Sequence, residues 1–107
     1  MKTYTKTELK ALNVEKGKYF FKPDTMRFFK SKLETTGRAI GGEIFFITSE
    51  VPPHGKREYS VRAMREETGT IKHLTIRFGS LRAAKEKMRD LILTVQHATM
   101  GTGHDKN

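Results

Sequence analysis

The amino-acid sequence predicts an α+β fold, with a three- or four-stranded antiparallel sheet that is packed on one face by two helices. Three runs of strand type follow one another, at Glu43–Glu50, Arg57–Glu66 and Thr70–Phe78. They lead directly into an amphipathic helical pattern over Leu81–Gln96, and another helical pattern lies earlier, at Thr25–Thr35. Consecutive strands that are joined to helices in this way are typical of two-layer α+β domains.

The N-terminus is expected to add a short extra helix. Thr5 and Glu8 have the spacing of a capping box, in which each side chain accepts a hydrogen bond from the other residue's backbone N–H. A helix over Lys6–Leu12 should follow, and Asn13 and Gly17 should end it.

Pro23 separates this region from the second predicted helix. Because proline disfavours α geometry at the preceding residue, the apolar run Tyr19–Phe21 is expected to be a strand or an extended anchor. Asp24 is the expected N-cap of the helix Thr25–Thr35, and Gly37 is the expected C′ residue beyond its end.

The strand segments predict where the core lies. Ile44–Ile47 is apolar at every position, which indicates either a strand that is covered on both faces or an interface. Arg57–Glu66 alternates between apolar and polar residues, as a strand with one buried face does. Inward-facing positions of the last strand and the last helix are expected in the core: Leu74, Ile76, Phe78, Met88 and Leu91.

The length of 107 residues predicts a single domain over residues 1–98, with a polar, glycine-rich and disordered tail over residues 99–107. The lack of cysteine excludes disulfides and thiolate metal sites, and it fits a cytoplasmic protein. No apolar run approaches the roughly 20 residues that cross a bilayer, and the polar N-terminus lacks a signal-peptide core. We therefore expect cytoplasmic localisation and no membrane partner.

The charge balance favours a polyanionic partner. Lys and Arg total 21 against 12 Asp and Glu, so the net charge is +9. A protein this basic attracts nucleic acid or acidic protein surfaces. The excess lies in residues 1–38 and 68–107, so the two ends of the chain should build any basic face.

The last predicted helix carries the clearest basic stripe. Arg82, Lys85 and Arg89 recur at i, i+3 and i+7, so they share one side of the helix and suit a phosphate backbone. The competing interpretation is an ordinary solvated face, because Glu86 can pair with Arg82. Four further cations extend the stripe if the fold brings them alongside it: Arg77, Lys72, Lys30 and Lys32.

The junction Gly79–Ser80 adds a possible phosphate site. Ser80 is the predicted N-cap of the last helix. Backbone N–H groups at a helix N-terminus bind anions, and Arg82 and Lys85 lie within the first two turns. These cations are therefore placed to close around a bound phosphate.

Signatures of common catalytic sites are missing from the sequence, which has no nucleophile elbow, P-loop or dinucleotide-binding glycine pattern. The four histidines do not pair at i, i+4, so a metal site is not expected. We predict a protein that is not an enzyme and has no cofactor or small-molecule substrate. Its predicted function is non-catalytic binding of DNA or RNA through the phosphate backbone. Weak sequence preference is expected, because no base-reading residue can be identified.

Three segments resemble a group of small uncharacterised bacteriophage proteins. They are the Tyr-Phe-Phe…Asp-Thr-Met-Arg-Phe-Phe signature within Lys18–Lys32, the stretch Ile47–Glu50 and the stretch Arg57–Arg62. The resemblance covers roughly residues 18–80. It implies a phage origin and action in the host bacterial cytoplasm, and it assigns no functional residue.

An alternative function follows from the aromatic residues. Seven phenylalanines and three tyrosines exceed what so small a core easily buries, and exposed rings mark protein interfaces or base-stacking surfaces. The alternative is a protein-binding phage effector that inhibits a host enzyme or defence complex. Its hot spots would lie around Phe20–Phe29 and Phe45–Phe46.

A second resemblance concerns the order of elements. Gly79, Ser80, Ala84 and Lys85 match the Gly-Ser-Lys-Lys-x-Ala-Lys motif that opens the last helix of double-stranded-RNA-binding domains, and Arg82 replaces a lysine. The three strands and helix also resemble the arm-type DNA-binding domain of phage integrases. The first resemblance implies phosphate contacts at the start of the last helix, although Leu81 breaks the motif.

Overall fold

A computed structural model describes residues 2–34, 36–74 and 77–105. Within these residues the chain forms three helices and six strands. In chain order they are β1 (Lys2–Tyr4), α1 (Lys6–Glu15), α2 (Pro23–Phe29), β2 (Lys32–Leu33), β3 (Gly37–Ile40), β4 (Glu43–Glu50), β5 (Glu58–Arg65), β6 (Ile71–His73) and α3 (Leu81–Asp105).

The strands form one antiparallel sheet, which confirms the α+β class but is larger than the three or four strands predicted. Its order is β1-β3-β4-β5-β6, and β2 pairs with β4 as well. Gly41 and Gly42 join β3 to β4, and both have positive φ, at 62° and 81°. Two such residues in succession are typical of a tight β-hairpin turn, where glycine is strongly favoured.

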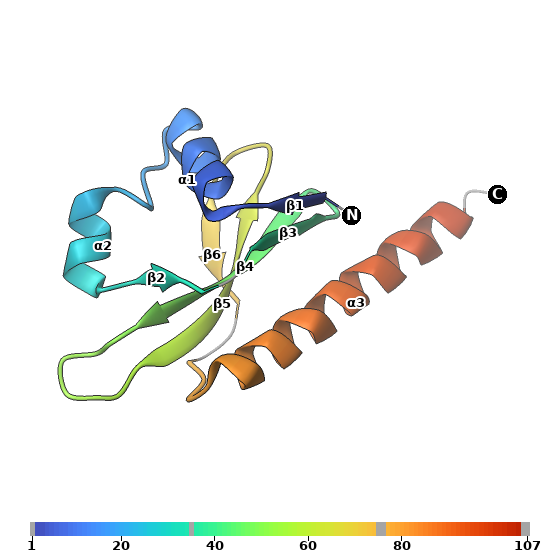
Figure 1. Cartoon of the computed structure of the whole chain (residues 1–107). Coiled ribbons are helices and arrows are strands. Elements are labelled where there is room, and N and C mark those ends of the chain that lie inside the picture. Colours follow the sequence, from blue (N-terminus) through green and yellow to red (C-terminus); the bar gives the residue numbers. More distant parts are fainter. Residues whose placement is uncertain (1, 35, 75–76, 106–107) are drawn as a thin grey trace.

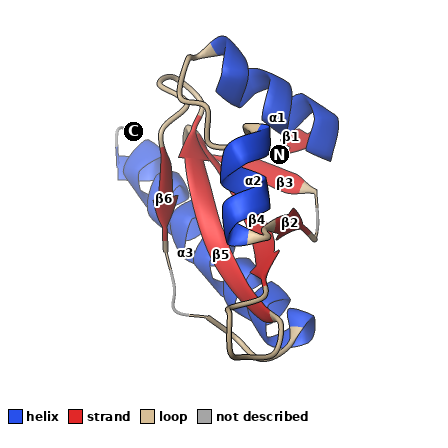
Figure 2. Cartoon of the chain, turned by 90° about the vertical axis from the view of Figure 1, so that its left-hand side faces the viewer, coloured by secondary structure: helices blue, strands red, loops and turns tan. Residues whose placement is uncertain are grey.

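The helices cover both faces of the sheet: α1 and α2 lie on one side and α3 lies on the other (Figure 1, Figure 2). The prediction that two helices share one face is therefore wrong. The central strand β4 explains why, because Ile44 and Phe46 point to the α1/α2 side while Phe45 and Ile47 point to α3. A strand that is apolar on both faces needs a cover on each, and that part of the prediction is confirmed.

Two hydrophobic cores result, one on each face. The α1/α2 core contains Tyr4, Leu9, Phe21, Leu33, Ala39, Ile44, Phe46 and Met64. The α3 core contains Phe45, Ile47, Val61, Ala63, Ala84, Met88 and Ile92. Of the predicted core positions, Met88 is buried, and Leu74, Phe78 and Leu91 pack half-buried against the same core. Ile76 lies outside the described residues.

The capping box at the start of α1 is confirmed. The Thr5 side chain accepts a hydrogen bond from the Glu8 backbone N–H, and the Glu8 carboxylate accepts one from the Thr5 N–H at 2.9 Å. The latter bond lowers the pKa of Glu8. However, α1 continues to Glu15, beyond its predicted end at Leu12.

Asn13 does not end α1 but holds it to its surroundings. Its fully buried amide donates to the Gly69 carbonyl at 3.1 Å, and its Oδ1 accepts from the Phe20 N–H at 2.7 Å. The Phe21 N–H also donates to Oδ1, at 3.4 Å. Phe20 and Phe21 therefore form a turn that is anchored on Asn13, rather than a strand or an extended segment.

The second helix is shorter than predicted. Lys22 is its N-cap and Pro23 its first residue, so Asp24 lies in the first turn, 3.6 Å from Arg27. The helix ends at Phe29, because Lys30 adopts a left-handed backbone conformation with φ 51°. The predicted helical segment beyond that point, at Lys32–Leu33, pairs with β4 instead.

The third helix begins as predicted. Ser80 Oγ accepts a hydrogen bond from the Ala83 N–H at 3.2 Å, which confirms Ser80 as the capping residue. The helix continues past Gln96 to Asp105, so it includes residues 99–105 of the segment for which we predicted disorder. No helix in the described part of the chain is both long and apolar enough to cross a bilayer.

Candidate nucleic-acid interface

A groove of about 280 Å³ lies between α3 and strand β3. We call it the α3 groove. It is lined by Arg38, Lys85, Glu86, Met88, Arg89 and Ile92. The groove therefore combines three cations, one carboxylate and two apolar side chains.

Two elements bring the cations of the α3 groove together. Lys85 and Arg89 are four residues apart on α3, so they lie on one side of the helix. Arg38 is paired with Phe45 in the sheet, and paired residues of antiparallel strands point to the same face. Since Phe45 packs in the α3 core, Arg38 points toward the helix as well.

The floor and rim of the groove differ in polarity. Met88 and Ile92 are only 5% and 4% exposed, and they pack against the sheet. Arg38, Lys85 and Arg89 are exposed, and none of the three forms an ion pair with another described residue. The groove thus presents, beside the Glu86 carboxylate and around an apolar base, three cations that have no ion-pair partner among the described residues.

Arg82 belongs to the predicted stripe but does not line the groove. Its Nε lies 3.5 Å from Glu86 Oε2, and both side chains are exposed. Exposed pairs of this kind contribute little to stability. The pair nevertheless offsets the charge of Arg82, so Lys85 and Arg89 are the stronger phosphate candidates of the stripe.

The four outlying cations do not form a continuous track with the groove. Lys72 Nζ lies 3.3 Å from Glu43 Oε1, and Arg77 Nη1 lies 3.3 Å from Glu58 Oε1. Lys30 caps the C-terminus of α2, across the sheet from α3. Lys32 is exposed on β2 and does not line the groove.

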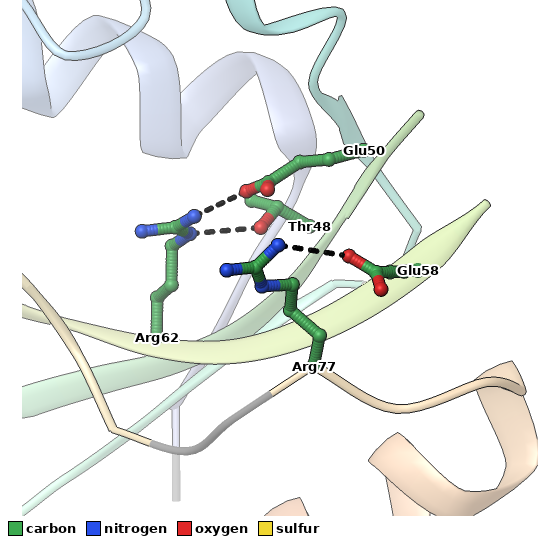
Figure 3. Close-up of polar contacts among 5 residues, drawn as sticks. All are labelled: Thr48, Glu50, Glu58, Arg62 and Arg77. Carbon is green, nitrogen blue, oxygen red and sulfur yellow. Dashed lines mark hydrogen bonds and ion pairs between the residues drawn. The ribbon is translucent and has the colours of Figure 1, made fainter. Parts of the chain in front are cut away.

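Arg77 instead joins a second charged region, the charge cluster, which Figure 3 shows on the sheet: Thr48, Glu50, Glu58, Arg62 and Arg77. Arg62 Nε donates to Thr48 Oγ1 at 2.8 Å, and its Nη2 pairs with Glu50. The Arg62 guanidinium also lies 5.4 Å from the centre of the Phe20 ring. Each arginine of the cluster therefore has its own carboxylate.

His73 is paired with Arg62 across β5 and β6. Partial burial and the neighbouring Arg62 charge lower the pKa of His73. The histidine is therefore biased toward its neutral form, and it adds no further cation to the charge cluster.

Arg38 was missed in the sequence, because its role depends on pairing that no local pattern reveals. The segment around it contains Gly37, Gly41 and Gly42, which predict a loop. Only the hairpin with β4 makes it a strand and points Arg38 toward α3. The sequence feature that could have drawn attention to Arg38 is its position as a lone cation between the predicted helix Thr25–Thr35 and the apolar strand Glu43–Glu50.

These features define a small basic α+β domain with a sheet covered on both faces and a cation-lined groove beside its last helix. The chain belongs to a family of unknown function (DUF7447), whose model matches residues 5–89. The matched segment contains every groove residue except Ile92. No curated protein and no solved structure matches the chain.

Proposed function

We propose that this protein binds nucleic acid without catalysing a reaction, through the phosphate backbone and with weak sequence preference. The proposal depends on one observation: three cations from two separate elements, Arg38, Lys85 and Arg89, line the same groove, and none of them forms an ion pair within the described part of the chain. A solvated helix face gives no reason for a cation of the neighbouring strand to lie beside it. Cations from two elements that line one groove are what contact with a phosphate chain would use.

The chemistry of the α3 groove suits a sugar–phosphate chain. Arginine presents a planar fork that binds phosphate oxygens in pairs, and lysine supplies a compact charge. Met88 and Ile92 are almost fully buried and form the floor of the groove, so its cations are the groups that would meet a ligand. None of the lining side chains can be assigned to the reading of a particular base, so DNA and RNA are both candidate ligands.

The test is the salt dependence of binding, measured by fluorescence anisotropy with labelled DNA and RNA. Each phosphate contact releases counterions, so affinity falls with salt on a logarithmic slope set by the number of contacts. The triple variant Arg38→Ala/Lys85→Ala/Arg89→Ala removes three such contacts. We expect the plot of log affinity against log salt to be less steep for this variant than for the wild type, by about 2–3 units of slope.

A charge-matched variant provides the control. Lys6→Ala/Lys10→Ala/Lys56→Ala removes three exposed cations outside the groove, so it has the same net charge as the groove variant. The control should keep a slope close to the wild-type value. Equal losses in both variants, or no wild-type binding at low salt, would refute the groove as a phosphate site.

A second candidate is the protein-binding effector. Phe45 and Phe46 are 4% and 0% exposed, so they cannot be its hot spots. Tyr19 and Phe29 are 54% and 55% exposed on the α1/α2 side, and they favour this candidate. In either case we propose that the protein is phage-encoded and acts in the bacterial cytoplasm, as its resemblance implies.

The two candidates differ in their response to salt and nuclease. Binding through aromatic anchors should persist at raised salt, whereas phosphate binding should weaken steeply. Recovery of one stoichiometric protein from nuclease-treated bacterial lysate would support the effector. Loss of all captured material after nuclease treatment would support nucleic-acid binding.

A further inference from the structure

The loop that joins α1 to α2 presents an aromatic ring among three lysines. We call residues 16–22 the aromatic loop. Tyr19 is 54% exposed. It is flanked in the sequence by three exposed lysines, Lys16, Lys18 and Lys22. None of these lysines forms an ion pair with a described residue. The loop lies across the sheet from α3 (Figure 1).

Tyr19 has an unusual backbone conformation. Its φ is 56°, in the left-handed region that bulky residues rarely occupy. The next residue, Phe20, is held in place because its N–H donates a hydrogen bond to Oδ1 of the buried Asn13, at 2.7 Å. The Lys22 N–H donates to the Tyr19 carbonyl at 3.4 Å. Strained residues that the surrounding structure fixes in place concentrate at functional sites.

Two of the three lysines, Lys16 and Lys18, are also held in position by packing. Gly69, in the turn after β5, lies against the side chains of Lys16 and Lys18. A Cβ atom at Gly69 would be 2.5 Å from Lys16 Cβ and 3.3 Å from Lys18 Cγ. The aliphatic stems therefore pack on the turn, while the charged ends extend toward solvent.

We infer that the aromatic loop is a second nucleic-acid contact, in which Tyr19 stacks on an unpaired base and Lys16, Lys18 and Lys22 contact the flanking phosphates. Aromatic stacking combined with cations is the usual chemistry of single-strand binding, and it tolerates any base. A base within a duplex is covered by its neighbours, so the loop should select single strands. The inference rests on the proposed function for its ligand class, nucleic acid. Its residues, however, lie on the opposite side of the sheet from the α3 groove.

The chain has no tryptophan, so a single substitution creates a unique fluorescent reporter. Tyr19→Trp reports the aromatic loop. Leu93→Trp reports the α3 groove, because Leu93 is 54% exposed and lies one turn beyond Arg89. Each variant is titrated with a short oligothymidylate at low salt. We expect saturable quenching of the Tyr19→Trp emission, with little quenching by a blunt duplex.

Affinity measurements separate binding from folding. Tyr19→Ala should weaken oligothymidylate binding about 5- to 100-fold, as the loss of one stacked base does. Tyr19→Gly should bind as weakly, but its Tm should equal or exceed that of the wild type, since glycine relieves the positive φ. Wild-type affinity in Tyr19→Gly would refute the stacking role.

The remaining outcomes distinguish the two sites and the class of partner. Quenching of Leu93→Trp without quenching of Tyr19→Trp would overturn this inference and leave the α3 groove in place. Quenching of Tyr19→Trp that persists in the Arg38/Lys85/Arg89 alanine variant would support the loop as a contact that does not depend on the groove. Equal quenching by polyglutamate and oligothymidylate would overturn the inference in favour of an acidic protein partner.

Discussion

The α3 groove and the charge cluster both contain arginines, but they differ in how the charge is compensated. In the cluster, Arg62 and Arg77 each pair with a carboxylate. In the groove, Arg38 and Arg89 have no carboxylate partner among the described residues. The comparison teaches that net charge does not locate a binding site, because pairing decides which cations remain available.

The interiors on the two sides of the sheet differ as well. The α1/α2 side buries Asn13 completely, and this amide makes hydrogen bonds with Gly69 and Phe20. Arg62 is largely buried on that side, with its side chain 15% exposed. We therefore expect substitutions on the α1/α2 side to change stability, and substitutions in the groove to change binding.

The largest expected effect is the loss of the buried Asn13 amide. Asn13→Ala leaves the Phe20 N–H and the Gly69 carbonyl without their partner in a buried site. Each unsatisfied group costs about 1–3 kcal/mol, so the free energy of unfolding should fall by about 3 kcal/mol or more. Urea denaturation measures this change, and a loss below about 1 kcal/mol would show that the turn does not depend on Asn13.

Arg62 provides the next test, because it separates structural from binding arginines. Arg62→Met keeps the aliphatic bulk but leaves Glu50 unpaired and 22% exposed. Breaking a buried pair is destabilising, and partial exposure reduces the cost, so we expect a loss of about 2 kcal/mol. Arg77→Ala is the matched control, since its exposed pair with Glu58 should contribute less than about 1 kcal/mol.

The Arg62→Met substitution should lower stability without lowering the affinity for nucleic acid. Arg62→Met should leave the affinity of the folded protein for nucleic acid unchanged, within twofold by anisotropy, because Arg62 already pairs with Glu50. A marked loss of affinity would mean that the charge cluster, rather than the groove, meets the ligand.

Arg38→Ala should have a smaller effect on stability than either of these changes. Arg38 is exposed and has no ion-pair partner in the described ranges, so the free energy of unfolding should change by less than about 0.5 kcal/mol. The slope of log affinity against log salt should nevertheless fall by about 1. A stability loss without a change in slope would make Arg38 a packing residue.

Local patterns predicted the parts of this fold that depend on neighbouring residues. The capping box at Thr5 and the cap at Ser80 are both present in the structure. The alternation along β5 places Val61 and Ala63 in one core and Met64 in the other, but both faces of the strand are covered, so the single buried face that it predicted is wrong. The continuous apolar run in β4 agrees with the two covered faces, whereas the expected placement of both helices on one face of the sheet is wrong.

The remaining features depend on contacts distant in sequence. The spacing of Met26, Phe29 and Leu33 fits one helix, but the left-handed Lys30 ends it and Leu33 pairs with Thr48 of β4. Tertiary pairing there overrides helical propensity. For the same reason Lys85 and Arg89 could be predicted as neighbours on a helix, whereas Arg38 joins them only through the β3–β4 hairpin.

The smallest expected effect is the pH dependence that His73 contributes. Partial burial and the Arg62 charge hold the pKa of His73 below its ordinary value in the folded state. The unfolded chain therefore binds the proton at higher pH than the folded chain does. As pH falls through about 6.5, where an unperturbed histidine titrates, protonation favours unfolding and stability decreases.

The variant His73→Gln removes this titration, so its stability should fall less than that of the wild type between about pH 7.5 and about pH 5.5, one unit on either side of the unperturbed histidine pKa. Urea denaturation at several pH values measures the difference. Arg62→Met should also reduce the loss of stability on acidification, since one of the charges that lower the His73 pKa is then absent. An identical pH profile in wild type and His73→Gln would place His73 outside the electrostatic influence of the charge cluster, and the cluster would then be confined to its two arginine–carboxylate pairs.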